Sequence, residues 1–442
     1  IVMEDVAKLP QNNKSIMIIY NLDNIKEPKE IRRVEIEGDL LSSRMIDNNV
    51  YFVVNRNILL DGIFNTERST LNENEYKPKY MDTLESNGIK QIEFNDIAYF
   101  ENPDTANYLI LAGVNINNNQ EADIKAFLGA GDIVYCSEKN IYIIKNVMQY
   151  DKQTRQIYNN KTEILKFALD NGKVNYKAEG EIEGYINNQF SIDENNGYLR
   201  IATTIGNWAT LTNDTTNTLF ILNENLDEVG KLEGLAKGEK IYSVRYVGNL
   251  AYIVTFKEVD PLFVIDLSDP GLPKLLGELK IPGYSTYLHP YDETHIIGIG
   301  YDVTNNGNTT NGIKMSMFDI SDINNPKELF FVKVGNNYIS SEVTYNHKAL
   351  YYSKEKNLIG FPIISYEKEN KYKAQVYEID LEKGFQLRGE VEHKSNKPND
   401  NFFYKNRILR ILSVGDILYS ISENQVKASD LNTLETKGNI FF

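Results

Sequence analysis

The stretch "VIDLSDPGLPK", from Val264 to Lys274, occurs in two further versions in the same chain, and this repetition decides the fold. The other copies are "IYNLDNIKEPK" from Ile19 and "MFDISDINNPK" from Met317. In each copy an apolar run ends in Asn or Asp, and Pro-Lys follows seven residues later. An apolar run, a polar corner and a proline at a fixed offset predict one strand-turn-strand unit used three times.

Weaker copies of the phrase fill the remainder of the chain at intervals of roughly 45 to 60 residues, which is the period of propeller blades. They begin near Asn107, Glu163, Thr218, Ala374 and Gln425. A second hairpin precedes each copy, as in "IYSVRYVGNLAYIVTF" from Ile241, which alternates around a Gly248-Asn249 turn. Tyr, Phe, Ile, Val and Thr are abundant, as expected of half-buried strands.

The pattern predicts an all-β fold, a β-propeller of four-stranded antiparallel blades. Residues 1–37 supply only one full hairpin, so we expect eight blades with the first incomplete, and seven as the alternative. A repeat array grows by stacking neighbours, so residues 1–442 are expected to form a single propeller domain. The seven complete blades are predicted to begin near Arg44, Gly131, Gln189, Ser243, Ser285, Ser340 and Arg407.

Charge and hydropathy exclude several functions. The formal net charge of -15 argues against nucleic acid and against an anionic membrane surface. No apolar run approaches the roughly 20 residues that span a bilayer, so no transmembrane segment is expected in this portion. The chain begins at Ile1 without an initiator methionine, so we expect any targeting signal to lie outside it. The lone Cys136 is expected to be a small buried apolar residue.

Short catalytic and metal-binding motifs are absent from the sequence: there is no HExxH, CxxC pair, G-x-S-x-G or P-loop. The segment "DVTNNGNTTNGI" from Asp302 resembles a calcium loop but ends in Ile313 where a bidentate Glu is required. The paired aspartates of the repeated corners, and the single "SIDENNGYL" segment from Ser191, are interpreted as turns. We therefore expect no metal and no cofactor.

Large polar residues recur at one position of the innermost strands. The third residue of five aligned strand starts is Arg44, Gln189, Arg245, Tyr287 or Glu342, and His289 shares the face of Tyr287. Equivalent positions of radially arranged blades converge on the central channel, so these side chains are expected to form a polar ring near one mouth.

Two interpretations of this ring remain open. The charged members either pair with one another and fill the channel, or bind an anionic or sugar-like ligand. Trp208, in the polar segment "IGNWATLTNDTTN", is a further candidate as an aromatic platform. The insert from Asn65 to Gly88 is long enough to carry function or to be disordered.

Three segments resemble the secreted prokaryotic β-propeller domain family, which is distantly related to WD repeats. They are "NQFSIDENNGYLRIATT" from Asn188, the long run "GEKIYSVRYVGNLAYIVTFKEVDPLFVIDLSDPGLPKLLGELKIPGYSTYLHPYDETHIIGIGYD" from Gly238, and "HKALYYSKEKNLIGFP" from His347. The resemblance extends more loosely to "SSRMIDNNVYFVVN" from Ser42. It implies a secreted or cell-surface propeller of bacteria or archaea, and it implies no established activity.

The sequence thus predicts an extracellular, non-catalytic binding or scaffolding module whose partner is a protein or a cell-wall polysaccharide. The alternative is a glycan-active hydrolase or lyase that uses carboxylates at the channel mouth. In that case Glu342 is the expected general acid or base, beside Arg245.

Overall fold

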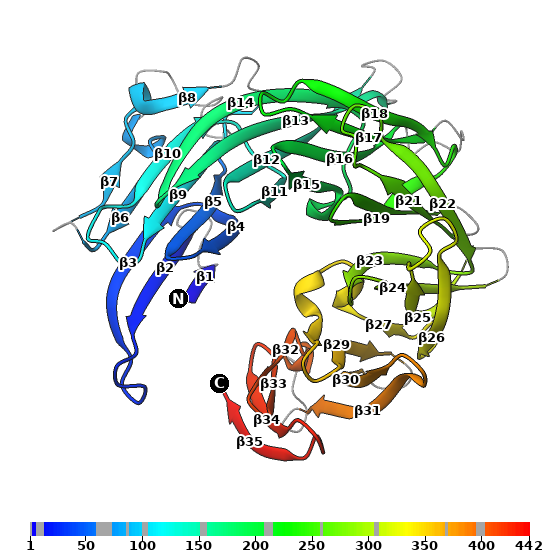
Figure 1. Cartoon of the computed structure of the whole chain (residues 1–442). Helices are drawn as coiled ribbons and strands as arrows, with labels where there is room; N and C mark the ends of the chain where they lie inside the picture. Colours follow the sequence, from blue (N-terminus) through cyan, green and yellow to red (C-terminus); the bar gives the residue numbers. More distant parts are fainter. Residues whose placement is uncertain are drawn as a thin grey trace. The chain divides into compact units, whose positions relative to one another are not determined.

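The computed structural model describes residues 2–5, 13–58, 73–84, 88–99, 105–150, 157–206, 215–256, 260–304, 309–366, 370–394 and 403–442. These residues are arranged in eight sheets, drawn in sequence order in Figure 1. The chain divides into two compact units, residues 1–200 with 222–228 and residues 201–221 with 229–442. Within the described residues no helix is both long enough and apolar enough to cross a bilayer.

Unit 1 contains the first three sheets. The first has the order β1-β2-β3-β6-β7 and the second β4-β5-β9-β10-β8, in which β8 pairs with β10 in parallel. The third has the order β11-β12-β13-β14. The strands are β1 (Val2–Asp5), β2 (Lys14–Asn21), β3 (Lys29–Glu37), β4 (Asp39–Ile46), β5 (Asn49–Arg56), β6 (Lys79–Asp82), β7 (Lys90–Gln91), β8 (Ile97–Tyr99), β9 (Tyr108–Asn115), β10 (Asp123–Leu128), β11 (Ile133–Cys136), β12 (Asn140–Tyr150), β13 (Ile157–Asp170) and β14 (Lys173–Glu183).

The fourth sheet follows, with strands β15 (Ile192–Asn195), β16 (Tyr198–Ile205), β17 (Thr216–Leu222) and β18 (Glu228–Leu235). Strand β15 belongs to unit 1, and the division between the units runs through the other three strands. The described residues of unit 1 also form the short 3-10 helices η3 (Glu73–Glu75), η4 (Phe94–Asp96) and η5 (Gln189–Ser191).

Unit 2 contains the last four sheets, which repeat the same up-and-down order. Strand β28 is an addition that pairs with β29. The strands are β19 (Lys240–Val247), β20 (Leu250–Phe256), β21 (Asp260–Asp266), β22 (Lys274–Ile281), β23 (Tyr284–Pro290), β24 (His295–Val303), β25 (Thr310–Asp319), β26 (Lys327–Val334), β27 (Ile339–Ser340), β28 (Tyr351–Ser353), β29 (Leu358–Ser365), β30 (Lys371–Asp380), β31 (Gly384–His393), β32 (Arg410–Val414), β33 (Ile417–Ile421), β34 (Gln425–Asp430) and β35 (Thr436–Phe441), with 3-10 helices η6 (Glu342–Thr344), η7 (His347–Ala349) and η8 (Phe403–Asn406).

The β-propeller prediction is confirmed, and each of the seven predicted blade starts falls within the first strand of a sheet or shortly before it. The copies of the repeated phrase from Val264 and Met317 form the turn between the third and fourth strands of their sheets, and the copy from Ile19 joins β2 to β3. In β21 the Asp266 carboxylate accepts hydrogen bonds from the backbone N–H and hydroxyl of Ser268 at 2.9 and 2.6 Å, and Asp319 accepts from the N–H of Ser321 at 2.9 Å. The corner aspartates therefore fix turns, as predicted.

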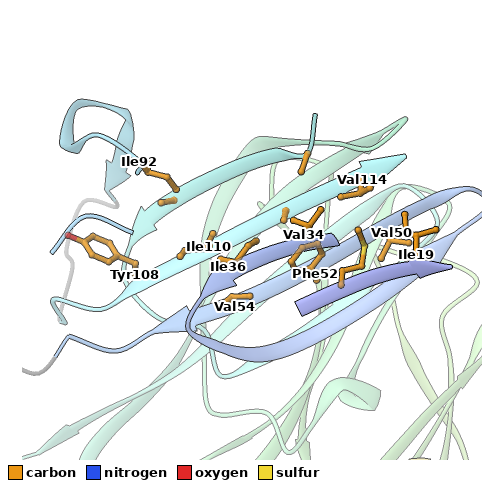
Figure 2. Close-up of a cluster of buried hydrophobic side chains, with 14 residues drawn as sticks. Ile19, Val34, Ile36, Val50, Phe52, Val54, Ile92, Tyr108, Ile110 and Val114 are labelled. Carbon is orange, nitrogen blue, oxygen red and sulfur yellow. The ribbon is translucent and has the colours of Figure 1, made fainter. Parts of the chain in front are cut away.

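Apolar side chains on facing strands form the core of each unit. In unit 1 one cluster lies between the first and second sheets, and Figure 2 shows its labelled side chains gathered between β2, β3, β5 and β9. The alternation of Val50, Phe52 and Val54 on β5 supplies one wall of this cluster, because every second residue of a strand points to the same face. Ile36 and Ile110 supply side chains from the neighbouring strands β3 and β9.

The second and third sheets approach each other closely at two glycines. A Cβ atom on Gly113 of β9 would lie 2.2 Å from the carbonyl oxygen of Gly172, in the turn between β13 and β14. The N–H of Gly172 donates to the Tyr51 hydroxyl at 3.0 Å across the same interface. Glycine at 113 is required because the facing backbone leaves no room for a side chain.

The insert expected to be a loop decoration contributes regular structure. Its residues 79–82 form β6, which pairs with β3 in the first sheet. The guanidinium of Arg32 donates to the Asp82 carboxylate at 2.6 and 3.1 Å, and both side chains are buried. Sequence analysis did not anticipate this strand because its four residues carry no clear alternation.

Candidate functional site

Unit 1 contains a cavity of about 1260 Å³ beside the hairpin turns of the second and third sheets. Its walls come from the end of β4, from β11 and the turn that follows it, from β13, and from the turns after β15 and β17. Eighteen residues line it, and its charged members are Arg44, Glu138, Lys139, Lys166, Lys177, Glu194 and Glu224. Of the predicted ring residues, Arg44 is part of this lining.

Glu194 of β15 is anchored by neighbouring donors. Its carboxylate accepts a hydrogen bond from the Ser137 hydroxyl at 2.5 Å and from the Asn140 side-chain amide at 2.7 Å. Its backbone N–H donates to the Tyr135 hydroxyl at 2.9 Å. Burial, followed by the nearby Glu194 charge, raises the pKa of the Tyr142 hydroxyl, which stays protonated. Both Glu194 oxygens therefore have protein donors already.

Arg44 lies at the end of β4 and is held by short-range bonds. Its guanidinium donates to the Ser43 carbonyl at 2.7 Å, to the Ser42 hydroxyl at 3.0 Å and to the Gln189 side-chain oxygen at 3.3 Å. The structure thus brings together two of the predicted ring residues, Arg44 and Gln189. Gln189 was expected on an innermost strand, but it lies in η5, the 3-10 turn that Asn188 caps before β15.

Cys136 of β11 lines the cavity and is only partly buried, whereas the sequence analysis expected a buried side chain. Burial raises the pKa of the Cys136 thiol to about 11, and the positive charge of Arg44 opposes this only in part. A thiol with so high a pKa is a poor nucleophile at neutral pH.

Alkylation of Cys136 tests this. At pH 8 the thiolate population is expected to be on the order of a hundredfold lower than for an ordinary cysteine, so iodoacetamide should modify the folded protein correspondingly slowly. Because Cys136 is the single cysteine of the chain, mass spectrometry of the intact protein measures the rate directly. The same protein in urea is the control and should react at the ordinary rate. Equal rates in both conditions would contradict the prediction.

Unit 2 holds three further predicted residues in one cluster. The Tyr287 hydroxyl and Nδ1 of His289, both on β23, lie 3.0 Å apart. Burial, followed by the positive charge of Arg245, lowers the pKa of His289 to about 4, so this imidazole is neutral at physiological pH. The rings of His289 and Tyr352 pack edge to face with centroids 4.3 Å apart. Arg245 on β19 is thus near enough to influence the charge state of His289, and the ring predicted from the inner strands stays a prediction.

Glu342 lies in η6 rather than on an innermost strand, which corrects the predicted placement. Its carboxylate pairs with Arg407 at 3.1 Å and with Arg410 at 3.0 Å, and its side chain is 11% exposed. The Asn346 amide donates to it at 2.6 Å. Neither arginine partner was predicted from the sequence. Arg407 could have been found, because it marks the predicted start of the last blade, as Ser340 marks the start of the blade that contains Glu342.

The other candidates stand as follows. Trp208 lies outside the described residues, so its role as a platform stays a prediction. Asp302, from the segment that resembles a calcium loop, forms an ion pair with Lys333 at 2.9 Å.

Asn196 and Gly197 in "SIDENNGYL" adopt φ angles of 52° and 82°, which confirms a tight turn. Lys166, Tyr135 and Lys177 of the cavity were also missed, because the alignment compared only the starts of inner strands.

The repeated four-stranded sheets define the class of protein as a β-propeller. The family model described as "Beta propeller domain" matches residues 3–434, and the chain belongs to that family.

Two archaeal relatives support the assignment. An uncharacterised protein of Methanocaldococcus jannaschii is 35% identical over 428 residues, which is 95% of this chain and 60% of that protein. An uncharacterised protein of Archaeoglobus fulgidus is 36% identical over 295 residues, which is 65% of this chain and 40% of that protein. The chain therefore spans 60% and 40% of the lengths of these two relatives.

Among solved structures, the periplasmic gluconolactonase of Pseudomonas aeruginosa has a TM-score of 0.42 at 8% identity, covering 75% of this chain and 92% of its own. Sqt1 of Chaetomium thermophilum has a TM-score of 0.44 at 11% identity, covering 77% and 82%.

Proposed function

We propose that this propeller is a non-catalytic binding module, secreted or held at the cell surface, whose ligand is a cell-wall polysaccharide. The observation that carries the proposal is the cavity of about 1260 Å³ in unit 1. Ligand sites for drug-sized molecules measure roughly 300 to 1,000 Å³, so this cavity has room for more than one sugar unit. A folded protein partner would contact a broad surface instead of a recess.

The lining supports a carbohydrate ligand. Asn196 and Asn225 present exposed side chains at two neighbouring turns, and amides of this kind bind sugar hydroxyl groups. Tyr135 adds an aromatic ring to the lining of the cavity. The polar groups therefore converge on one recess, which is the general property of a small-ligand site.

The alternative function, a glycan-active hydrolase or lyase, relies on Glu342 as acid or base. The arrangement of Glu342 does not favour it, because both carboxylate oxygens accept hydrogen bonds from arginines. A general acid or base has to exchange a proton with its substrate, and two guanidinium groups occupy the oxygens that would do so.

Replacing Glu342 separates the two functions. A Glu342→Gln variant should bind glycans as the wild type does and should be less stable by about 1.5–3 kcal/mol, because hydrogen bonds to a charged group are lost. Glycan binding by calorimetry and the urea midpoint are the two measurements. Glycan cleavage by the wild type that disappears in Glu342→Gln would establish the enzymatic alternative.

A binding screen tests the proposed function itself. The whole chain is mixed with neutral and acidic cell-wall oligosaccharides and with peptides, and the melting temperature is recorded, because a ligand that binds only the folded state raises it. We expect at least one oligosaccharide class to raise the melting temperature. If only peptides raise the melting temperature, or if no compound does, the polysaccharide proposal is wrong.

Protease treatment of intact producing cells, followed by immunodetection of the protein, tests the proposed location at the cell surface.

A further inference from the structure

Lys166 is an unusual lysine because it is buried without a carboxylate partner. It lies on β13 with 6% of its surface exposed, and it lines the cavity of unit 1. Its ammonium group donates to the Glu224 carbonyl oxygen at 3.1 Å and lies 5.7 Å from the centre of the Tyr142 ring. Among the described residues it forms no ion pair. An ammonium group has three donors, and a buried charge is costly unless it is paired.

The other cations of the cavity are also without carboxylate partners. Within the same described ranges, neither Arg44, Lys139 nor Lys177 forms an ion pair. The acidic residues of the lining do not compensate for Lys166. Glu194 is engaged by Ser137 and Asn140, and Glu138 and Glu224 have exposed side chains. The most buried charged side chain of the lining is therefore a cation, Lys166, and its ammonium group has donors to spare.

From this geometry we propose that the cavity binds a carboxylate-bearing sugar, with the ligand carboxylate on Lys166. This inference rests on the proposed function and names its substrate class. Charge-assisted hydrogen bonds between ammonium and carboxylate are among the strongest available, and a site shielded from water strengthens them. The amides of Asn196 and Asn225 then bind the sugar hydroxyl groups.

The net charge of -15 argues that recognition is local. A chain of this charge repels polyanions at long range, so the selectivity for an acid has to come from contacts inside the cavity. A ligand carboxylate that displaces water around Lys166 forms an ion pair with its ammonium group, whereas a neutral ester of the same sugar cannot form one.

Calorimetry with trigalacturonate and its methyl ester provides the test on the whole chain. The acid should bind, and the ester should bind at least about tenfold more weakly, because one charge-assisted bond is lost. Lys166→Met should lower the affinity for the acid by about tenfold or more and leave ester binding unchanged. Lys173→Met, which removes an exposed lysine of β14 outside the cavity, is the matched control and should bind like the wild type.

Cys136 reports whether the ligand occupies this cavity. Because Cys136 shares the lining with Lys166, saturating trigalacturonate should slow its alkylation at pH 9.5 severalfold. Lys166→Arg, which keeps the charge, should retain part of the affinity and serves if Lys166→Met does not fold. Equal binding of acid and ester, unchanged affinity in Lys166→Met, or unprotected Cys136 would each overturn the inference.

The outcomes also separate the two proposals. If neutral oligosaccharides raise the melting temperature but the acid has no advantage over its ester, the polysaccharide proposal stands and the carboxylate assignment fails. If an acidic peptide such as triglutamate binds more tightly than trigalacturonate, the sugar assignment is wrong. If no oligosaccharide binds at all, the proposed function fails as well.

Discussion

An Asp82→Ala variant is expected to lose about 3–5 kcal/mol of unfolding free energy, because it leaves the Arg32 guanidinium buried and unpaired. Arg32 and Asp82 have side chains only 4% and 1% exposed. The carboxylate also accepts hydrogen bonds from the backbone N–H groups of Leu84 and Ala122, at 3.1 and 3.0 Å. One substitution thus removes the counter-charge of Arg32 and the acceptor of two backbone amides, one just after β6 and one directly before β10.

Urea unfolding followed by circular dichroism measures the loss. The matched control is Glu30→Ala, which breaks an exposed pair with Arg33 at 2.8 Å and should change the unfolding free energy far less, because solvent screens this pair. If Asp82→Ala were as stable as Glu30→Ala, the buried pair would not stabilise the first sheet.

The same pair predicts a dependence on pH. Burial opposes ionisation of Asp82, but hydrogen bonds from Arg32, Leu84 and Ala122 outweigh it and hold the pKa of this carboxyl below its ordinary value of 3.8. A lowered folded-state pKa gives stabilisation that is complete above pH 3.8 and is lost as pH falls through the folded value. The difference in stability between wild type and Asp82→Ala should therefore shrink below pH 3.8.

A Phe52→Ala variant is the second change with a large expected effect, a loss of about 3–5 kcal/mol. Phe52 is 2% exposed and lies within the cluster between the first and second sheets (Figure 2). Removing its ring withdraws apolar surface from the core and leaves a void that the surrounding strands cannot close fully.

The urea midpoint again provides the measurement. Phe442→Ala is the control, because this ring is 79% exposed and its removal should change stability by less than about 0.5 kcal/mol. A Phe52→Ala midpoint close to that of Phe442→Ala would show that the cluster is not a core.

The fold was predictable because its information is local and repeated. The corner after Val264 recurs after Met317, and in both places the structure has a register shift between the third and fourth strands. The same turn, in which an aspartate carboxylate accepts a hydrogen bond from the backbone N–H two residues later, occurs again at the ends of β30 and β34. Periodicity of two along the strands then determined which residues are buried.

The site was predictable only in part, because its contacts join residues far apart in sequence. Arg44 and Gln189 are 145 residues apart, and the alignment of strand starts placed both in one group. Nothing local distinguished Lys166, whose ammonium group donates to the carbonyl oxygen of Glu224, 58 residues away. Similarly, the partners of Glu342 come from the following sheet, 65 and 68 residues on. Such pairings arise from packing between sheets, which no strand pattern encodes.

The contact between Gly113 and Gly172 has a consequence for recognition. Backbone meets backbone there without an intervening side chain, so no rotamer change can let the second and third sheets slide past each other. These two sheets supply Arg44, Cys136 and Lys166 to the lining of the cavity. We therefore expect these three side chains to keep their spacing when a ligand binds, so that little conformational entropy is lost in bringing them together.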